Sequence, residues 1–252
     1  MKIDKFLDGL TVGYDIPALP GMREDEIVTP CLAIDLDVLE SNLKTMGDYT
    51  RSKGVKLRPH GKMHKSADIA RLQQEIGNAT GLCCQKVSEA EAFIRAGIDD
   101  ILISNEVRHP VMIDRLARLS ADGARISVCV DDLEAVAALD AAAGEHETTI
   151  TCLVEYDSGG KRCGVISLTG LMDIARTIGD APNLNFGGIQ AYHGTMQHIV
   201  EYEDRRAAAL KSIQHANAAV EMLLVNGIKC PTVTGGGTGS YEFEASSRLY
   251  SE

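Results

Sequence analysis

The sequence predicts a (β/α)8 barrel of the TIM type, and three observations support that fold class. Short apolar segments alternate with amphipathic segments along most of the chain, as βαβ units built on a parallel sheet require. The number of these units matters, because about eight of them close a barrel. Polar motifs also follow nearly every apolar segment, whereas an open doubly wound sheet would concentrate them at one switch point.

The predicted strands are short and apolar, as strands covered on both faces should be. They comprise residues 31–34, 55–58, 80–84, 100–104, 125–130, 149–156, 185–191 and 232–234. In the helix expected after the first strand, Leu39, Leu43 and Met46 share one face, and Asp35 or Asp37 can cap its N-terminus. The later helices are predicted at residues 66–76, 87–96, 111–119, 133–143, 168–178 and 203–225.

The domain organisation follows from where this alternation begins. Residues 1–28 contain several glycines and prolines and show no helical period, so we expect an irregular N-terminal arm there. Residues 29–252 then form one barrel domain, since barrels reach this size as single domains. Within it, residues 241–252 should add one more turn or helix.

Composition excludes several classes of protein. The chain has 252 residues, a net charge of −11 and 44% apolar residues, which is typical of a globular protein whose main partner is not nucleic acid. No apolar window is long enough to span a membrane, and no secretory leader is visible. The seven cysteines form no C-x-x-C array, so we expect reduced thiols in a cytoplasmic protein.

The stretch from Arg58 to Lys65 is the main candidate for chemistry. Pro59 ends a predicted strand and Gly61 permits a tight turn, so Lys62 lies just past a strand end. Lysine, arginine and histidine side chains surround it, and clustered positive charge lowers the pKa of one amine in such a group. A neutral amine is what Schiff-base formation needs.

Three other interpretations of this stretch stay open at this point. It could be a solvated basic face, which is the usual role of a charge run. A phosphate or nucleic-acid patch is disfavoured by the net charge of −11. A zinc site through His60 and His64 would need a helix, which Pro59 and Gly61 disfavour, and the acidic residue expected between such histidines is absent.

A second candidate is the glycine run after the last predicted strand. Gly235, Gly236 and Gly237 let backbone N–H groups point at an anion, and Thr238 adds a hydroxyl. Phosphate sites of barrels lie near the seventh and eighth strands, which favours a phosphate cradle over a flexible connector. Loops after the strands share one face of a barrel. Other candidates on that face are Gln85, Asn105, Asp157, Arg162, Tyr192 and His193.

Several of these motifs together resemble one family. The run Arg58–Lys65 (Arg-Pro-His-Gly-Lys-Met-His-Lys) resembles the cofactor-lysine motif of the D-threonine aldolase and D-serine dehydratase family, pyridoxal-phosphate enzymes with the alanine-racemase-like fold. Segment 12–21 resembles the 3-hydroxy-D-aspartate aldolases within that group. Further matches occur in the family's order at residues 83–90, 104–106, 160–164, 190–194 and 235–240.

The resemblance implies a role for each candidate. Lys62 would carry pyridoxal 5′-phosphate, and Gly236, Gly237 and Thr238 would bind its phosphate. Gln85 and Tyr192 would contact the cofactor, and Arg162 would face either its ring nitrogen or the substrate carboxylate. His193 is the candidate base for the β-hydroxyl, or alternatively a support for Tyr192.

The implied activity is that of a lyase. It would cleave the Cα–Cβ bond of a D-3-hydroxy amino acid, with 3-hydroxy-D-aspartate giving glycine and glyoxylate as the leading reaction. D-threonine aldolase and D-serine or 3-hydroxyaspartate dehydratase are the alternatives. A pyridoxal-phosphate carrier without turnover is an alternative of another class. A homodimer is left open.

Family members continue past the glycine run into a mainly β-strand domain, which carries a divalent-metal site (Mg, Mn, Co or Zn). The resemblance therefore predicts a barrel truncated before that C-terminal domain, and a metal that binds only with it. We identify no metal ligand among the residues of this sequence. His146, His198 and His215 are scattered on predicted helices and loops.

Overall fold

The computed structural model describes residues 9–252 and divides the chain into two compact units, Met1–Ser41 and Asn42–Glu252. In the first unit, the described residues include the 3-10 helix η2 (Glu24–Glu26), and helix α1 (Leu36–Lys53) runs across the boundary. The predicted arm, residues 1–28, falls within the first unit, and its residues 1–8 lie outside the described part of the chain.

Residues 31–34, predicted as the first strand, form no strand, and this prediction was wrong. Leu32 is 98% exposed and Ile34 is 55% exposed. An apolar run indicates which side chains favour burial, but a strand also needs a neighbour that pairs its N–H and C=O groups. The helix cap was predicted correctly, because the Asp35 carboxylate accepts a hydrogen bond from the Val38 N–H at 3.0 Å.

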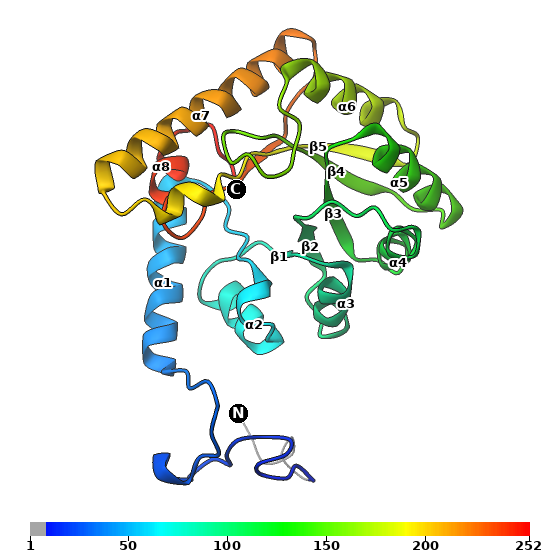
Figure 1. Cartoon of the computed structure of the whole chain (residues 1–252). Helices are drawn as coiled ribbons and strands as arrows, with labels where there is room; N and C mark the ends of the chain where they lie inside the picture. Colours follow the sequence, from blue (N-terminus) through cyan, green and yellow to red (C-terminus); the bar gives the residue numbers. More distant parts are fainter. Residues whose placement is uncertain (1–8) are drawn as a thin grey trace. The chain divides into compact units, whose positions relative to one another are not determined.

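The second unit is built on a parallel sheet whose strands are hydrogen-bonded in sequence order (Figure 1). Its strands within the described residues are β1 (Leu82–Cys84), β2 (Asp100–Ile103), β3 (Arg125–Val130), β4 (Ile150–Glu155), β5 (Leu184–Gln190) and β6 (Thr232–Thr234). Most residues of β3 and β4 are buried, as predicted for strands covered on both faces. Six predicted strands are therefore confirmed, two with the predicted ends and four with an end shifted by one or two residues.

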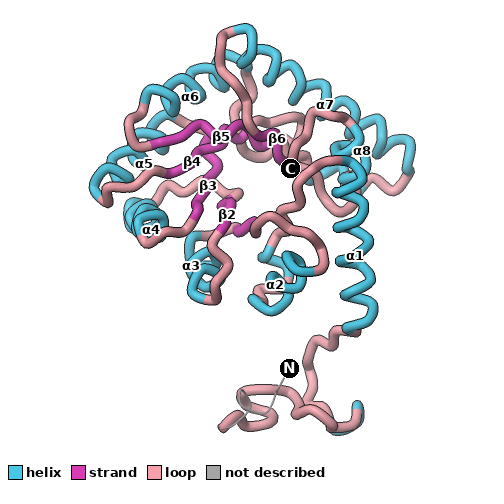
Figure 2. Tube along the Cα trace, turned by 180° about the vertical axis from the view of Figure 1, so that it is seen from behind, coloured by secondary structure: helices cyan, strands magenta, loops and turns pink. Residues whose placement is uncertain are grey.

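Helices α2 to α7 lie outside this curved sheet, where Figure 2 shows them in cyan around the magenta strands. The helices of this unit are α2 (Ala67–Glu75), α3 (Val87–Arg95), α4 (Pro110–Ala121), α5 (Leu133–Glu145), α6 (Leu168–Asp180), α7 (Tyr202–Val225) and α8 (Tyr241–Ser246). In α6 the buried residues Leu171, Ile174, Ala175 and Ile178 recur at the spacing of one helix face. All the predicted helices are confirmed, and α8 is the extra helix expected near residue 241.

The two edges of the sheet are joined by segments that are not regular strands. Residues 55–58, predicted as a strand, form only one isolated bridge, from Leu57 to Ala79, so this prediction was wrong. On their other side, the Lys56 N–H donates to the Ser251 carbonyl at 2.9 Å, and the Ser251 N–H donates to the Val233 carbonyl of β6 at 3.0 Å. Residues 249–252 thus occupy the closing position of the ring, between residues 55–58 and β6.

An ion-pair network stabilises this closure. The Arg58 guanidinium donates to Asp100 Oδ1 at 2.6 Å and to Glu252 Oε1 at 2.9 Å. The Arg58 and Glu252 side chains are only 13% and 7% exposed, so these charges are largely removed from water. A Cβ on Gly81 would lie 2.3 Å from Arg58 Nη1, which explains why glycine occupies that position.

The interior of the ring is filled by a small apolar layer, separate from the main core between sheet and helices. Its members come one each from four adjacent strands: Cys83, Leu102, Cys129 and Leu153. This packing resembles the layered interior of barrels and makes the ring a core rather than a channel. Among residues 9–252, no helix is long and apolar enough to cross a bilayer.

Candidate active site

A cavity of about 750 Å³ opens beside the ends of β2, β5 and β6, a volume that suits a small-molecule ligand. Six of the predicted site residues line it: Lys62, Tyr192, Gly235, Gly236, Gly237 and Thr238. The structure therefore brings the predicted lysine and the predicted phosphate cradle to one cavity.

Lys62 is presented by the short 3-10 helix η3 (Gly61–Met63). The His60 ring caps this helix, with Nδ1 accepting the Lys62 N–H at 3.3 Å. Gly61 is buried, and a Cβ there would lie 2.8 Å from the Leu82 side chain, so only glycine allows η3 to pack this close to β1. The turn thus fixes the Lys62 backbone while its side chain stays exposed at the cavity.

The histidines beside Lys62 add no positive charge at neutral pH. Burial, followed by the Lys62 charge, lowers the pKa of His60 to about 4. Burial also lowers the pKa of His64. The Nε2 of neutral His60 lies 3.4 Å from the Ser104 hydroxyl. The basic cluster expected from the sequence is therefore carried by lysine and arginine side chains rather than by imidazolium groups.

The glycine run is shaped by close neighbours on two sides. A Cβ on Gly237 would lie 2.1 Å from Gln197 Nε2, and one on Gly235 would lie 2.5 Å from the Ala191 carbonyl oxygen. Gly236 has φ +81°, and a Cβ there would have Glu244 atoms as its nearest neighbours, at 3.7–3.8 Å. The run therefore packs tightly at its ends and is open at its middle, as a cradle for an anion requires.

Gln197 holds this cradle to the wall formed by Tyr192. Its amide Nε2 donates to the Tyr192 hydroxyl at 2.7 Å, and its Oε1 accepts the Gly239 N–H at 3.0 Å. The Arg162 guanidinium lies 5.5 Å from the centre of the Tyr192 ring, within cation–π range. Tyr192 is therefore fixed from both sides.

Gln85, Arg162 and His193 are not among the residues that line the cavity within the described chain. For Gln85, the backbone N–H donates to Glu89 Oε2 at 2.9 Å. His193 caps the 3-10 helix η4 (Gly194–His198), where its Nδ1 accepts the Met196 N–H at 3.3 Å. Arg162 adjoins the cavity through Tyr192. Their assigned roles remain predictions.

Next to Arg162 in the sequence, Cys163 forms a cluster with two carboxyl groups, which the sequence analysis did not identify. Ligand atoms of Glu106, Glu155 and Cys163 lie within 4.8 Å of one another, close enough for one cation. Burial, and then the charge of Glu106, raises the pKa of Glu155 to about 8. Gln190 Nε2 donates to Glu155 Oε2 at 2.5 Å, so one oxygen of that carboxyl is already engaged.

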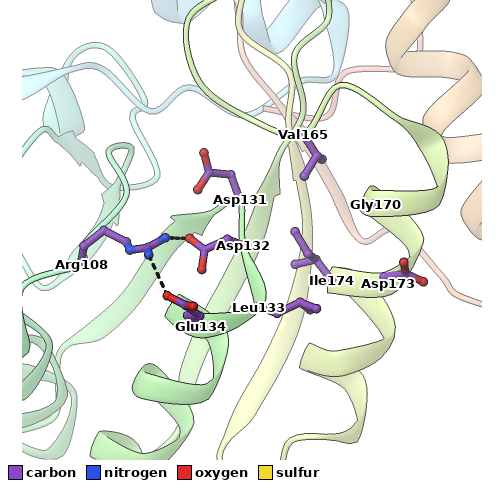
Figure 3. A pocket seen from close by; sticks show the side chains of 9 residues that line it. All are labelled: Arg108, Asp131, Asp132, Leu133, Glu134, Val165, Gly170, Asp173 and Ile174. Atoms are coloured by element: carbon purple, nitrogen blue, oxygen red, sulfur yellow. Dashed lines mark hydrogen bonds and ion pairs between the residues drawn. The ribbon is translucent and has the colours of Figure 1, made fainter.

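A second pocket, of about 450 Å³, lies at the N-terminal ends of α5 and α6 (Figure 3). Arg108 forms ion pairs there with Asp132 and Glu134. Asp131, which also lines this pocket, accepts the Gly164 N–H at 3.2 Å and so helps to hold the loop that carries Arg162. Arg108, Asp131, Asp132 and Glu134 are thus engaged in contacts within the structure, so they support the fold around the site.

The arrangement agrees with a family model. Residues 34–250 match the model of the alanine racemase N-terminal domain, which covers most of the chain. The chain belongs to the alanine racemase N-terminal domain family. The matched region contains Lys62, the glycine run and both edges of the ring.

Individual members of this family are similar over nearly the whole chain. A 3-hydroxy-D-aspartate aldolase from Paracoccus denitrificans (strain Pd 1222) is 54% identical over 97% of this chain and 63% of its own length. A D-threonine aldolase from Arthrobacter sp. is 43% identical over 94% of this chain and 62% of its own length. The crystal structure of D-threonine aldolase from Filomicrobium marinum superposes with a TM-score of 0.91 at 41% identity, covering 94% and 63% of the two chains. The chain therefore spans less than two thirds of the length of these relatives.

Sequence reasoning missed three groups that shape the cavity of this family member. Gln197, Glu244 and Tyr250 all line it, and each lies on a helix or tail whose orientation the sequence pattern does not fix. The spacing of Ser240 and Glu244, four residues apart, was the one available signal, since such residues face each other on a helix. Glu155 was also missed, because it lies inside the predicted apolar strand 149–156.

Proposed function

We propose that this chain is the cofactor-binding barrel of a pyridoxal-phosphate-dependent aldolase that cleaves the Cα–Cβ bond of a D-3-hydroxy amino acid. The observation that carries the proposal is that Lys62 and the glycine run line one cavity. The substrate we favour is 3-hydroxy-D-aspartate, which would give glycine and glyoxylate. The 54% identity to a protein named for that reaction supports this choice.

The residues present fit the cofactor on structural grounds. The cavity is lined by the amine of Lys62 and by the open glycine cradle with the hydroxyl of Thr238. The middle glycine leaves room for a phosphate, because a Cβ there would meet nothing nearer than 3.7 Å. When bound, the cofactor's ring supplies the electron sink that accepts the pair left at Cα as a bond breaks.

Each side chain then has a stated task. Lys62 supplies the amine that binds the cofactor's aldehyde, and Gly236, Gly237 and Thr238 hold the phosphate. Tyr192, fixed between Gln197 and Arg162, forms a wall that orients what lies in the cavity. Gln85 and Arg162 remain proposed cofactor contacts.

His193 remains the proposed base for the β-hydroxyl, with one structural condition. Because Nδ1 accepts the Met196 N–H, the neutral ring carries its proton on Nε2. To take a proton from a substrate, the ring must release Met196 and expose Nδ1. If it does not, His193 donates from Nε2 to a substrate oxygen or supports Tyr192.

The divalent metal also stays a proposal, tied to the C-terminal domain of the relatives. The cluster of Glu106, Glu155 and Cys163 is a poor fit for a catalytic metal. It does not line the cavity, and Glu155 holds its proton near neutral pH and is bonded to Gln190. A homodimer and a cytoplasmic location also belong to the proposal. The location is supported by seven free thiols.

The test is chemical labelling of the full-length protein with cofactor bound. Borohydride reduction followed by peptide mass spectrometry should place the pyridoxyl group on Lys62. Lys62→Ala should lose both the label and the visible absorbance, whereas Lys65→Ala, which removes an exposed lysine 3.6 Å from Glu89, should keep them. Label on Lys65 or Lys56 would contradict the assignment of Lys62 as the cofactor-binding lysine.

The substrate is tested separately. With cofactor and divalent metal, the protein should release glyoxylate from 3-hydroxy-D-aspartate faster than acetaldehyde from D-threonine. The reverse preference would favour D-threonine aldolase, for which the 41% identical structure is the supporting observation. Release of ammonia in place of glycine would indicate a dehydratase.

A further inference from the structure

One group in the cavity has no role in the function proposed so far. Glu244 on α8 lines the cavity and is only 4% exposed. Its Oε1 accepts the Ser240 hydroxyl at 3.0 Å, but its Oε2 is buried and has no hydrogen-bond partner among the described residues. A buried carboxyl oxygen without a partner costs free energy, so its position calls for a ligand.

Glu244 Oε2 lies beside the open face of the glycine cradle. It would be 3.8 Å from a Cβ placed on Gly236, the glycine whose surroundings leave most room. Ser240 connects the two features, because its Oγ also accepts the Gly237 N–H at 3.3 Å. An anion seated on the cradle would therefore meet Glu244.

No cation faces this carboxyl to offset its charge within residues 9–252. From the C-terminal tail it faces Tyr250, whose phenol donates to the Ala191 carbonyl at 2.8 Å and so has no proton to give. From α7 and η4, the apolar Ala209 and Met196 pack on α8. The titratable neighbours on the packed elements are phenols: Tyr202 of α7 contacts the Phe243 ring, and Tyr49 of α1 contacts the Tyr241 ring. Burial raises the pKa of Glu244 to about 7, with smaller opposing contributions from its own backbone and from Ser240.

The protonation state decides what Glu244 can do. An ionised carboxylate has only acceptor oxygens and would repel a phosphate dianion, whereas a neutral carboxylic acid has one O–H to donate. Protonation thus converts a repulsive contact into a hydrogen bond to a charged acceptor, which is among the stronger kinds.

We propose that Glu244 is a protonated hydrogen-bond donor to the cofactor's phosphate, so that phosphate binding on the glycine cradle takes up one proton from solvent at this side chain. The inference rests on the proposed function, because it assumes that the cradle holds that phosphate. It predicts that cofactor affinity falls as pH rises above the range in which free Glu244 holds its proton.

The test uses full-length protein freed of its cofactor and titrated with 4-deoxypyridoxine 5′-phosphate. This probe has no aldehyde, so Lys62 makes no covalent contribution. Calorimetry in buffers of different ionisation enthalpy counts the protons taken up. At pH 8 we expect an uptake approaching one proton, and the affinity should fall about fivefold from pH 7 to 8 and about ninefold from pH 8 to 9. Phosphate-free deoxypyridoxine corrects for titration of the ring.

Two variants test whether the pH dependence comes from the Glu244 carboxyl or from neighbouring groups. Glu244→Gln keeps a donor of similar shape but does not titrate, so its affinity should stay constant over this range and its proton uptake should vanish. Glu242→Gln changes a neighbouring carboxyl on the same helix, whose charge acts on Tyr202, and should keep the wild-type slope. Circular dichroism checks that both variants are folded.

The outcomes are distinct. Wild-type binding without proton uptake, or a Glu244→Gln variant that keeps the pH slope, would overturn the proposal and leave the cradle in place. The wild type could also fail to bind the phosphate probe while the cofactor still labels Lys62. That result would mean that the phosphate does not bind at the glycine cradle, and it would overturn the cradle assignment as well. Because proton uptake is measured on the wild type, an unstable variant does not remove the test.

Discussion

At the scale of single residues, Gly236 links backbone geometry to cofactor affinity. Its φ of +81° suits glycine, and its open face points to where a phosphate would sit. Gly236→Val places a branched side chain on that face, so cofactor binding should weaken by about 2 kcal/mol through lost charge-assisted hydrogen bonds. Equilibrium titration of the cofactor-free protein measures this loss.

A matched control for backbone strain is available at Gly227. It has φ +78°, a Cβ placed there would meet no atom within 4 Å, and it does not line the cavity. Gly227→Val should therefore lower stability as Gly236→Val does, while cofactor affinity stays at the wild-type value. Equal losses of affinity in the two variants would place the phosphate away from Gly236.

Glu155 predicts a pH dependence of stability. Burial, and then Glu106, raises its pKa to about 8 from an ordinary value of 4.5, so the folded state binds more protons than the unfolded state between these two pH values. Stability contributed by the protonated group is therefore full below pH 4.5 and is lost as pH rises towards 8. Glu155→Gln should remove this loss, and its advantage over the wild type should grow from pH 5 to 8.

Urea unfolding at several pH values measures that difference. Glu134→Gln is the control, because its carboxylate is 90% exposed and its removal should shift stability little at any pH. Parallel curves for wild type and Glu155→Gln would show that Glu155 ionises normally in the folded protein.

The role of a site residue could be predicted from the sequence where the residue directly follows a predicted strand. Lys62 and Thr238 follow strand ends, and strand ends of a barrel share one face, so the sequence alone brought them to one site. Glu244 was not predictable, because its importance comes from being buried beside Gly236, and burial of a carboxyl on a short helix depends on how that helix packs. The same holds for Glu155, whose partner Gln190 lies on the next strand.

At the scale of elements, the N-terminus of α6 offers a test of helix capping. Ser167 Oγ accepts the Gly170 N–H at 3.1 Å, which satisfies one of the unpaired donors of the first turn. Ser167→Ala should lower the free energy of unfolding by about 1 kcal/mol. Thr169→Ala is the control, since that hydroxyl contacts Ser167 but caps no backbone group, and denaturant unfolding should find it nearly neutral.

Helices were easier to predict than strands, for a physical reason visible in two segments. The apolar stripe of α6 specifies a helix by itself, because a helix pairs its own backbone groups. Residues 31–34 are all apolar and residues 55–58 alternate apolar with basic side chains, but a strand also depends on its neighbours. Within residues 9–252, residues 31–34 pair with no strand. Residues 55–58 have one isolated bridge, from Leu57 to Ala79, on one side and the C-terminal tail on the other.

At the scale of the whole second unit, Arg58 should contribute more to stability than any surface charge. It lies between Asp100 and Glu252, and all three side chains are mostly buried. Arg58→Met would leave the buried Glu252 without its cation and Asp100 with only its contact to Arg125 at 3.3 Å, so the free energy of unfolding should fall by about 3 kcal/mol or more. Urea unfolding measures this loss.

Arg118→Met is the matched control for removing an arginine. That side chain is 64% exposed and pairs with Asp114 at 3.0 Å on the surface of α4, so its loss should cost less than about 1 kcal/mol. A similar cost for both variants would mean that the Arg58 network is no stronger than a surface pair.

The closure of the ring also bears on the order of folding. Arg58 and Glu252 are 194 residues apart in sequence, so bringing them together carries a large loop-closure entropy that local helix and strand formation does not. Strands β1 to β6 pair with sequence neighbours and can assemble progressively, whereas the joint between residues 56 and 251 must wait for both edges. Lys62 follows one edge and Thr238 follows the other, so the cavity takes shape only in that last step. A growing chain on the ribosome would therefore acquire its cofactor site only after the segment around residue 251 has left the exit tunnel.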